Sequence, residues 1–141
     1  MACFINNDTA SQNEFGIQAK QGDTFTGVSF WLFTNVDSEV VVKKTDTPDD
    51  EENLSPFDLT DYTGKMEVKI RQDDLYAVIT FETGTASMVF VANEIQLLQN
   101  NTTMDIPAIN YVYDVQLTNT LTSVVKTYIE GDFIVTKDVT N

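Results

Sequence analysis

Hydrophobic and polar side chains alternate along most of the chain, which is the pattern of a half-buried β-strand. Residues 64–71 show it most clearly, because Met66, Val68 and Ile70 alternate with charged residues. Successive side chains of a strand point to opposite faces of its sheet. This segment therefore predicts a strand with one packed face and one hydrated face.

Further strands are predicted where the alternation recurs or where aromatic and β-branched residues are dense. They are residues 23–33, 76–81, 86–91, 109–118 and 124–139. The links at residues 82–84 and 119–123 predict two hairpins, and Gly27 predicts a β-bulge. Residues 93–98 fit either a strand or a single helical turn, because a short mixed pattern does not fix the period.

About seven or eight short strands separated by turn signals, without a convincing amphipathic helix, are typical of a two-layer all-β domain. We expect an antiparallel two-sheet β-sandwich, Ig-like or jelly-roll-like, over residues 14–141. Residues 1–13 form an arm that we expect to become ordered on a partner. The expected core faces of the last two strands are Tyr111, Tyr113, Val115 and Leu117 on one, and Val125, Ile129, Phe133, Val135 and Val139 on the other.

The segment at residues 35–56 breaks the regular spacing of the strands. It holds a short predicted strand at residues 39–44, followed by an acidic run. Loops of this length in compact domains are usually functional or mobile. We therefore expect this acidic insert to be the partner-specific feature of the domain.

Both faces of the strand at residues 23–33 carry large apolar side chains, since Phe30 and Leu32 alternate with Trp31 and Phe33. Large apolar faces of this kind are usually covered by another part of the protein or by a partner. Three alternatives stay open: cover by the other sheet and the insert, a subunit interface, or a carbohydrate-binding platform of exposed aromatic residues. The interface candidates are Phe30, Trp31, Leu32, Val40, Val41, Val42, Asp49, Asp50, Glu51 and Glu52.

The composition restricts the chemistry of the chain. It has no histidine, one cysteine (Cys3), and a net charge of -14 from 22 acidic and 8 basic residues. Without histidine, Ser-His-Asp and Cys-His catalysis are excluded, and one cysteine cannot build a zinc site or an internal disulfide. The negative charge disfavours direct contact with nucleic acid or anionic membranes. We expect no catalytic residue, cofactor or metal ligand.

The targeting signals of secreted and membrane proteins are missing. The sequence has no apolar run of about 18 residues and no basic, apolar leader. We therefore expect a soluble chain that is made in a reducing cytoplasm.

Carboxylates are the only groups left for catalysis or ion binding. The cluster Asp49 to Glu52 lacks the spaced ligands and the turn glycine of a dedicated calcium loop, so a solvated acidic loop is the simpler interpretation. Asp73 and Asp74 lie between two predicted strands, where turns favour aspartate. A glycosidase would need two acids held about 5 to 9.5 Å apart, and no such pair stands out in the sequence.

Four segments keep a distinctive order along the chain. They are QAKQGDTFTG at 18–27, DLTDYTGKMEVKIR at 58–71, MDIPAINYVYDVQLTN at 104–119 and VVKTYIEGDFIVTKDVT at 124–140. This order resembles a β-sandwich domain that is widespread in virion proteins of tailed bacteriophages. That family has a QGDTF strand, a DLTGYT turn, an ARMQIR-like strand, an AGTYVYDLQL strand and a closing G-x-F-x-V-x-x-x-VT strand.

The resemblance implies a non-enzymatic virion structural protein, an adaptor, decoration or fibre-anchoring subunit assembled in the host bacterial cytoplasm. Its partners would be capsid, neck, tail or fibre proteins, with homo-oligomers such as trimers by analogy with phage fibres. Two departures from the family are the insert at 35–56 and the absence of a fibre shaft after Asn141. The alternatives are a receptor- or carbohydrate-binding module of a fibre, and a carboxylate-dependent glycosidase or lyase.

Overall fold

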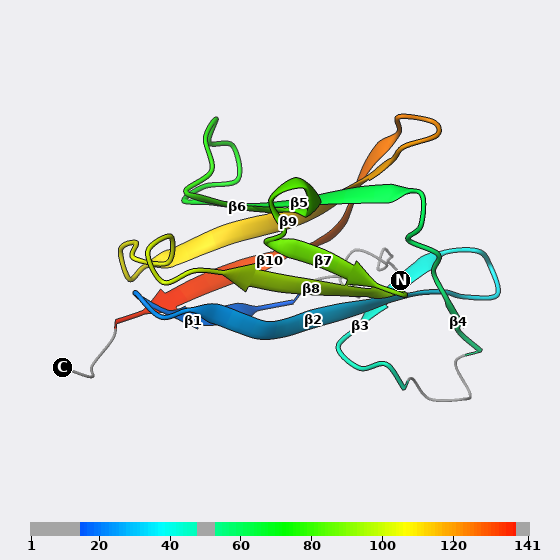
Figure 1. Ribbon diagram of the computed structural model, residues 1–141, viewed down its shortest axis with the longest axis horizontal. Coiled ribbons are helices and arrows are strands. Elements are labelled where there is room, and N and C mark those ends of the chain that lie inside the picture. Colours follow the sequence, from blue (N-terminus) through cyan, green and yellow to red (C-terminus); the bar gives the residue numbers. More distant parts are fainter. Residues whose placement is uncertain (1–14, 48–52, 138–141) are drawn as a thin grey trace, which may run out of the picture.

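The chain folds into two β-sheets that pack face to face, as expected for a β-sandwich (Figure 1). A computed structural model describes residues 15–47 and 53–137. These residues form ten strands in two five-stranded sheets. The all-β class is confirmed, and the described strands are more numerous than the seven or eight expected because several have only two to four residues.

The first sheet is mixed and curled. Its strand order is β1-β10-β9-β5-β6, with β1 at Ile17–Lys20, β10 at Val125–Thr136, β9 at Asn110–Asn119, β5 at Tyr62–Lys69 and β6 at Ile79–Glu82. β1 runs parallel to β10, and the other neighbours are antiparallel. The expectation of a purely antiparallel fold is therefore wrong for β1. The predicted β9–β10 hairpin is confirmed.

The second sheet contains the aromatic strand and the strands of the insert. Its order is β3-β2-β8-β7, with β2 at Phe25–Thr34, β3 at Val40–Lys43, β8 at Glu94–Gln99 and β7 at Met88–Val91, and the short β4 at Ser55–Pro56 also pairs with β2. The ambiguous segment at 93–98 is thus a strand. Gly27 lies in a register shift of β2 and has a φ of +85°, which confirms the predicted bulge.

The predicted hairpin across residues 82–84 is wrong. β6 belongs to the first sheet and β7 to the second, and a 3-10 turn at Thr83–Thr85 carries the chain from one sheet to the other. Ala86 follows this turn with a left-handed φ of 64°. A short link with a glycine therefore marks a crossing between layers here, which the local pattern cannot distinguish from a hairpin turn.

The core lies between the two sheets and contains the alternating residues of the long strands. The expected core face of β9 is confirmed, because Tyr111, Tyr113, Val115 and Leu117 are all buried. On β10 the prediction holds for Ile129, Phe133 and Val135 and is wrong for Val125, which is 57% exposed beyond a register shift. Val139 lies outside the described residues. Ile70, expected to pack, is 50% exposed because β5 has already ended.

The insert at 35–56 is partly a framework element. Its first part forms the β2–β3 hairpin and its last residues form β4, so both described parts pair with the end of β2. Asn35 closes the hairpin, since its side-chain oxygen accepts the N–H groups of Asp37 and Glu39 at 2.9 Å each. The insert therefore completes the second sheet.

Candidate functional site

Three of the ten interface candidates belong to the core. Phe30 and Leu32 have no exposed surface and Val42 is 2% exposed. All three point toward the first sheet, and the ring centroid of Phe30 lies 5.4 Å from that of Phe15. Their assignment to an interface is wrong because the face of β2 that carries Phe30 and Leu32 is the inner one.

Of the remaining candidates, the structure describes three, all on β2 and β3. Trp31 is half-buried on the other face of β2, and the register places it between Lys43 on β3 and Glu94 on β8. Val40 packs against the core, and Val41 lines a shallow hollow near Leu54. The acidic candidates Asp49, Asp50, Glu51 and Glu52 lie outside the described residues.

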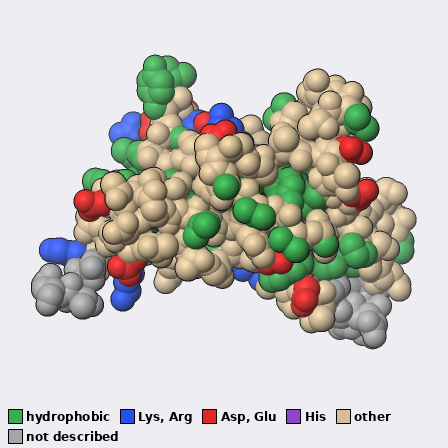
Figure 2. All heavy atoms as spheres, viewed as in Figure 1, with side chains coloured by type: hydrophobic (Ala, Val, Ile, Leu, Met, Phe, Trp, Pro, Cys, Tyr) green, Lys and Arg blue, Asp and Glu red, His purple; other side chains and the backbone are tan. Residues whose placement is uncertain are grey.

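Two loops at the edge of the first sheet, which the sequence did not single out, each expose a pair of large apolar side chains. Leu75 and Tyr76, in the β5–β6 loop, are 82% and 80% exposed. Leu121 and Val124, in the β9–β10 hairpin, are 76% and 59% exposed. We call these two pairs the apolar tips. Figure 1 shows the two loops that carry them rising above β5, one at each of its ends, and the molecular outline in Figure 2 dips between these loops.

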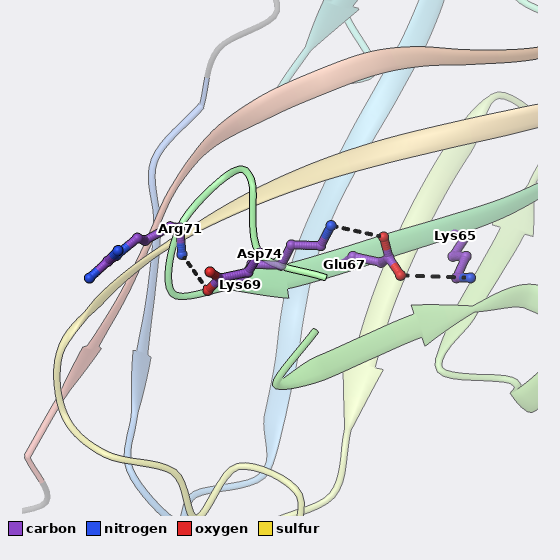
Figure 3. Close-up of polar contacts among 5 residues, drawn as sticks. All are labelled: Lys65, Glu67, Lys69, Arg71 and Asp74. Carbon is purple, nitrogen blue, oxygen red and sulfur yellow. Dashed lines mark hydrogen bonds and ion pairs between the residues drawn. The ribbon is translucent and has the colours of Figure 1, made fainter. Parts of the chain in front are cut away.

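The first tip is supported by a closed turn. The Asp74 carboxylate accepts the backbone N–H of Arg71 at 3.0 Å, and the N–H of Asp74 donates back to the Arg71 carbonyl at 3.1 Å (Figure 3). This confirms the turn role expected for Asp74. Val78 then donates to Val68 at 2.7 Å and returns the chain to the sheet. Because the loop ends are hydrogen-bonded, Leu75 and Tyr76 are held away from the core.

The second tip is supported in the same way. The side-chain oxygen of Asn119 accepts the N–H groups of Leu121 at 2.9 Å and Thr122 at 3.2 Å. Ser123 has a left-handed φ of 63°, and the N–H of Asn119 donates to the Val124 carbonyl at 2.9 Å. Hydrogen bonds therefore fix this hairpin turn, which leaves Leu121 exposed to solvent.

The outer face of the first sheet, between the tips, carries a row of carboxylates. The strand register sets Glu67 opposite Asp114, and Asp114 opposite Glu130. We call these three residues the acidic row. They line a hollow of about 170 Å³ together with Lys69, Gln72, Val112 and Asp132 among others. This hollow is smaller than the roughly 300–1,000 Å³ of typical small-molecule sites.

Charge compensation in the acidic row is uneven. The carboxylate of Glu67 lies 3.7 Å from the ammonium groups of both Lys65 and Lys69 (Figure 3). Asp114 Oδ1 is buried without a hydrogen-bond partner among the described residues. Burial raises the pKa of Asp114, the charge of Glu67 raises it further, and Lys69 opposes both. A cation placed beside Asp114 would therefore stabilise the charged form of its carboxylate.

The described residues contain no group of three acidic or cysteine side chains arranged to hold a metal ion. Among the same residues, no helix is long and apolar enough to cross a membrane. The hollow at the acidic row is small and open, and the apolar tips protrude into solvent.

No protein-family model matches this chain, and no curated protein matches its sequence.

Proposed function

We propose that this chain is a structural protein of a tailed-bacteriophage virion, an adaptor, decoration or fibre-anchoring subunit that works through protein-protein contacts. The observation that carries the proposal is the pair of apolar tips, which hydrogen-bonded turns hold out at both ends of one sheet. Exposed apolar groups are costly in water unless a partner covers them. The tips therefore fit a subunit that is completed by its neighbours.

The four segments that resemble the phage domain support the same proposal. They fall on β1–β2, on β5 with the turn before it, on β9, and on β10. The resemblance therefore covers four of the five strands of the first sheet, and in the second sheet it reaches only the start of β2. The finer Ig-like or jelly-roll-like classification belongs to this proposal, as do the virion location, the non-enzymatic role and a homo-oligomeric state such as a trimer.

The proposal is tested in particles of the phage whose genome encodes the chain. Mass spectrometry of density-purified virions should detect the wild-type chain at a fixed copy number. The variant Leu75→Ser/Leu121→Ser should be depleted from particles while keeping the melting temperature of the wild type, since neither side chain packs in the core. The matched control is Val91→Ser/Leu98→Ser, which removes two side chains that are 50% and 46% exposed on β7 and β8 of the other sheet.

Two results would contradict the proposal. One is the absence of the wild-type chain from purified particles. The other is equal incorporation of the tip variant and the control, because the tips would then have no role in assembly.

The second candidate function is a receptor- or carbohydrate-binding module. The observation that favours it is Tyr76, an 80% exposed aromatic ring two residues after Asp74. Aromatic rings next to carboxylates are suited to stacking on sugar rings and bonding their hydroxyls. Binding on a glycan array that disappears in Tyr76→Ser would support this module, and an array without binding would remove it.

A further inference from the structure

The acidic row is an unusual feature for the face of a sheet. Side chains directly opposite each other on neighbouring strands have Cβ atoms about 4.5–5.5 Å apart, and like charges in this arrangement are destabilising. Here three acids on β5, β9 and β10 follow one another in a single row. Asp132 lies one row further along β10, opposite Val112. Negative charge thus accumulates across the three strands, whereas the signs alternate along β5, where Lys65 and Lys69 flank Glu67.

The lysines of the same face make their ion pairs with one member of the row, although the charge of Lys69 also acts on Asp114. Lys65 and Lys69 both pair with Glu67. Within the described part of the chain, no ion pair reaches Asp114, Glu130 or Asp132, and the inner oxygen of Asp114 has no hydrogen-bond donor. Three carboxylates at one open hollow therefore have unused capacity to accept hydrogen bonds from a cation.

The apolar tips bound this face at its two ends. The Leu75 tip follows the Lys69 end of β5, and the Leu121 tip lies beyond its Tyr62 end, where Tyr62 pairs with Asn119. An object seated on the face would contact carboxylates at its centre and apolar side chains at its margins. This combination of central charge and apolar flanks restricts the kind of partner that fits.

The charge of the face decides between occupants. A second copy placed symmetrically on the face would present the same acidic row, and the two rows would repel. Nucleic acid and anionic membranes are excluded by the same sign of charge. We propose that the outer face of β5, β9 and β10 docks a positively charged, apolar-flanked surface of another protein, with a lysine or arginine side chain entering the hollow beside Asp114.

This inference rests on the proposed virion function and names the chemistry of the partner surface. A cation in the hollow would compensate the charge of Asp114 and Glu130, and partner side chains at the margins would cover the tips. Charged pairs that become desolvated at an interface are strong only when both members are present, so removal of the acids should weaken docking strongly.

The test compares two variants that remove the same charge. Glu130→Gln/Asp132→Asn neutralises two carboxylates of the hollow, and Glu94→Gln/Asp23→Asn neutralises two carboxylates away from it. Copies per particle are counted by quantitative mass spectrometry after washing virions in about 0.15 M and 1 M salt. We expect the hollow variant to lose at least about tenfold in occupancy at the lower salt, and the control to match the wild type.

Carbodiimide cross-linking of intact virions gives a second readout. The expected product joins Glu130 or Asp132 to a lysine of a different virion protein. Equal retention of both variants together with cross-links confined to other faces would overturn the docking inference while leaving the virion function intact. Absence of the wild-type chain from particles would overturn both.

Discussion

The hydroxyl of Tyr113 on β9 donates a 2.6 Å hydrogen bond to the backbone carbonyl of Phe15. Phe15 precedes β1 and its N–H donates to the Glu130 carbonyl on β10 at 3.1 Å. Gly131, opposite Tyr113 in the sheet, leaves the space through which the Phe15 backbone passes. The start of the described chain is thereby attached to the middle of the first sheet.

Tyr113→Phe tests how much the hydrogen bond to Phe15 contributes to the stability of the fold. The substitution keeps the buried ring and leaves the Phe15 carbonyl without its donor, so the free energy of unfolding should fall by about 1–2 kcal/mol. The control is Tyr76→Phe, whose ring is 80% exposed and whose change should stay within about 0.5 kcal/mol. Urea denaturation of both variants measures the difference. Equal effects would show that the hydrogen bond does not hold the chain start.

The same tyrosine makes a prediction for alkaline solution. Burial raises the pKa of Tyr113 above its usual value, and the charge of Asp132 adds to the shift. The unfolded chain therefore loses this proton first, near pH 10. The contribution of Tyr113 to stability is complete below that pH and is lost as the pH rises above it. Melting temperatures between pH 8 and 11 should fall more steeply for the wild type than for Tyr113→Phe, and parallel curves would contradict the assignment.

Local alternation was sufficient to predict the long strands but not how they pair. The buried faces of β5 and β9 follow from a period of two, which each segment carries in its own sequence. The parallel pairing of Ile17 with Phe133 joins segments at opposite ends of the chain, and no local pattern encodes such a contact. The same reason explains the wrong hairpin at 82–84, since a turn does not show whether the next strand joins the same sheet.

The candidate site was less predictable than the fold. Glu67 could be assigned to a hydrated face from alternation alone, whereas the acidic row appears only when three strands are in register. Tyr76 was predicted to begin a strand because it is aromatic and precedes β-branched residues. In the structure the Asp74 turn ends later than that prediction assumed, and β6 begins at Ile79. The hydrogen bonds of the turn, and not the aromatic and β-branched composition, therefore determine where β6 begins.

Gly131→Ala should be strongly destabilising. A Cβ at this position would overlap the carbonyl oxygen of Phe15, and the atoms in the way are backbone. Relief requires that the chain start moves off β10, which also breaks the Tyr113 hydrogen bond, so a loss of about 2–4 kcal/mol is expected.

The matched control for this substitution is Gly16→Ala. Nothing lies within 4 Å of a Cβ at Gly16, so the change should be small. Thermal unfolding of the two variants measures the contrast. A Gly131→Ala protein as stable as the control would mean that the Phe15 segment can shift without cost.

Asp114→Asn should stabilise the isolated chain near neutral pH. The pKa of Asp114 is raised mainly by burial, so the folded chain holds this proton to a higher pH than the unfolded chain, and stability falls as the pH rises through that range. Asparagine removes the charge and keeps the shape. Because Asp114 is only half-buried, solvent screening should limit the gain to less than about 1 kcal/mol.

The gain in stability of Asp114→Asn should shrink toward zero near pH 3, where the aspartate is itself neutral. Asp23→Asn, an exposed change, should show no such trend in melting temperatures from pH 3 to 7. A neutral-pH loss of stability in Asp114→Asn would mean that the folded protein relies on this charge, and the acidic row would then be self-compensated and need no partner cation.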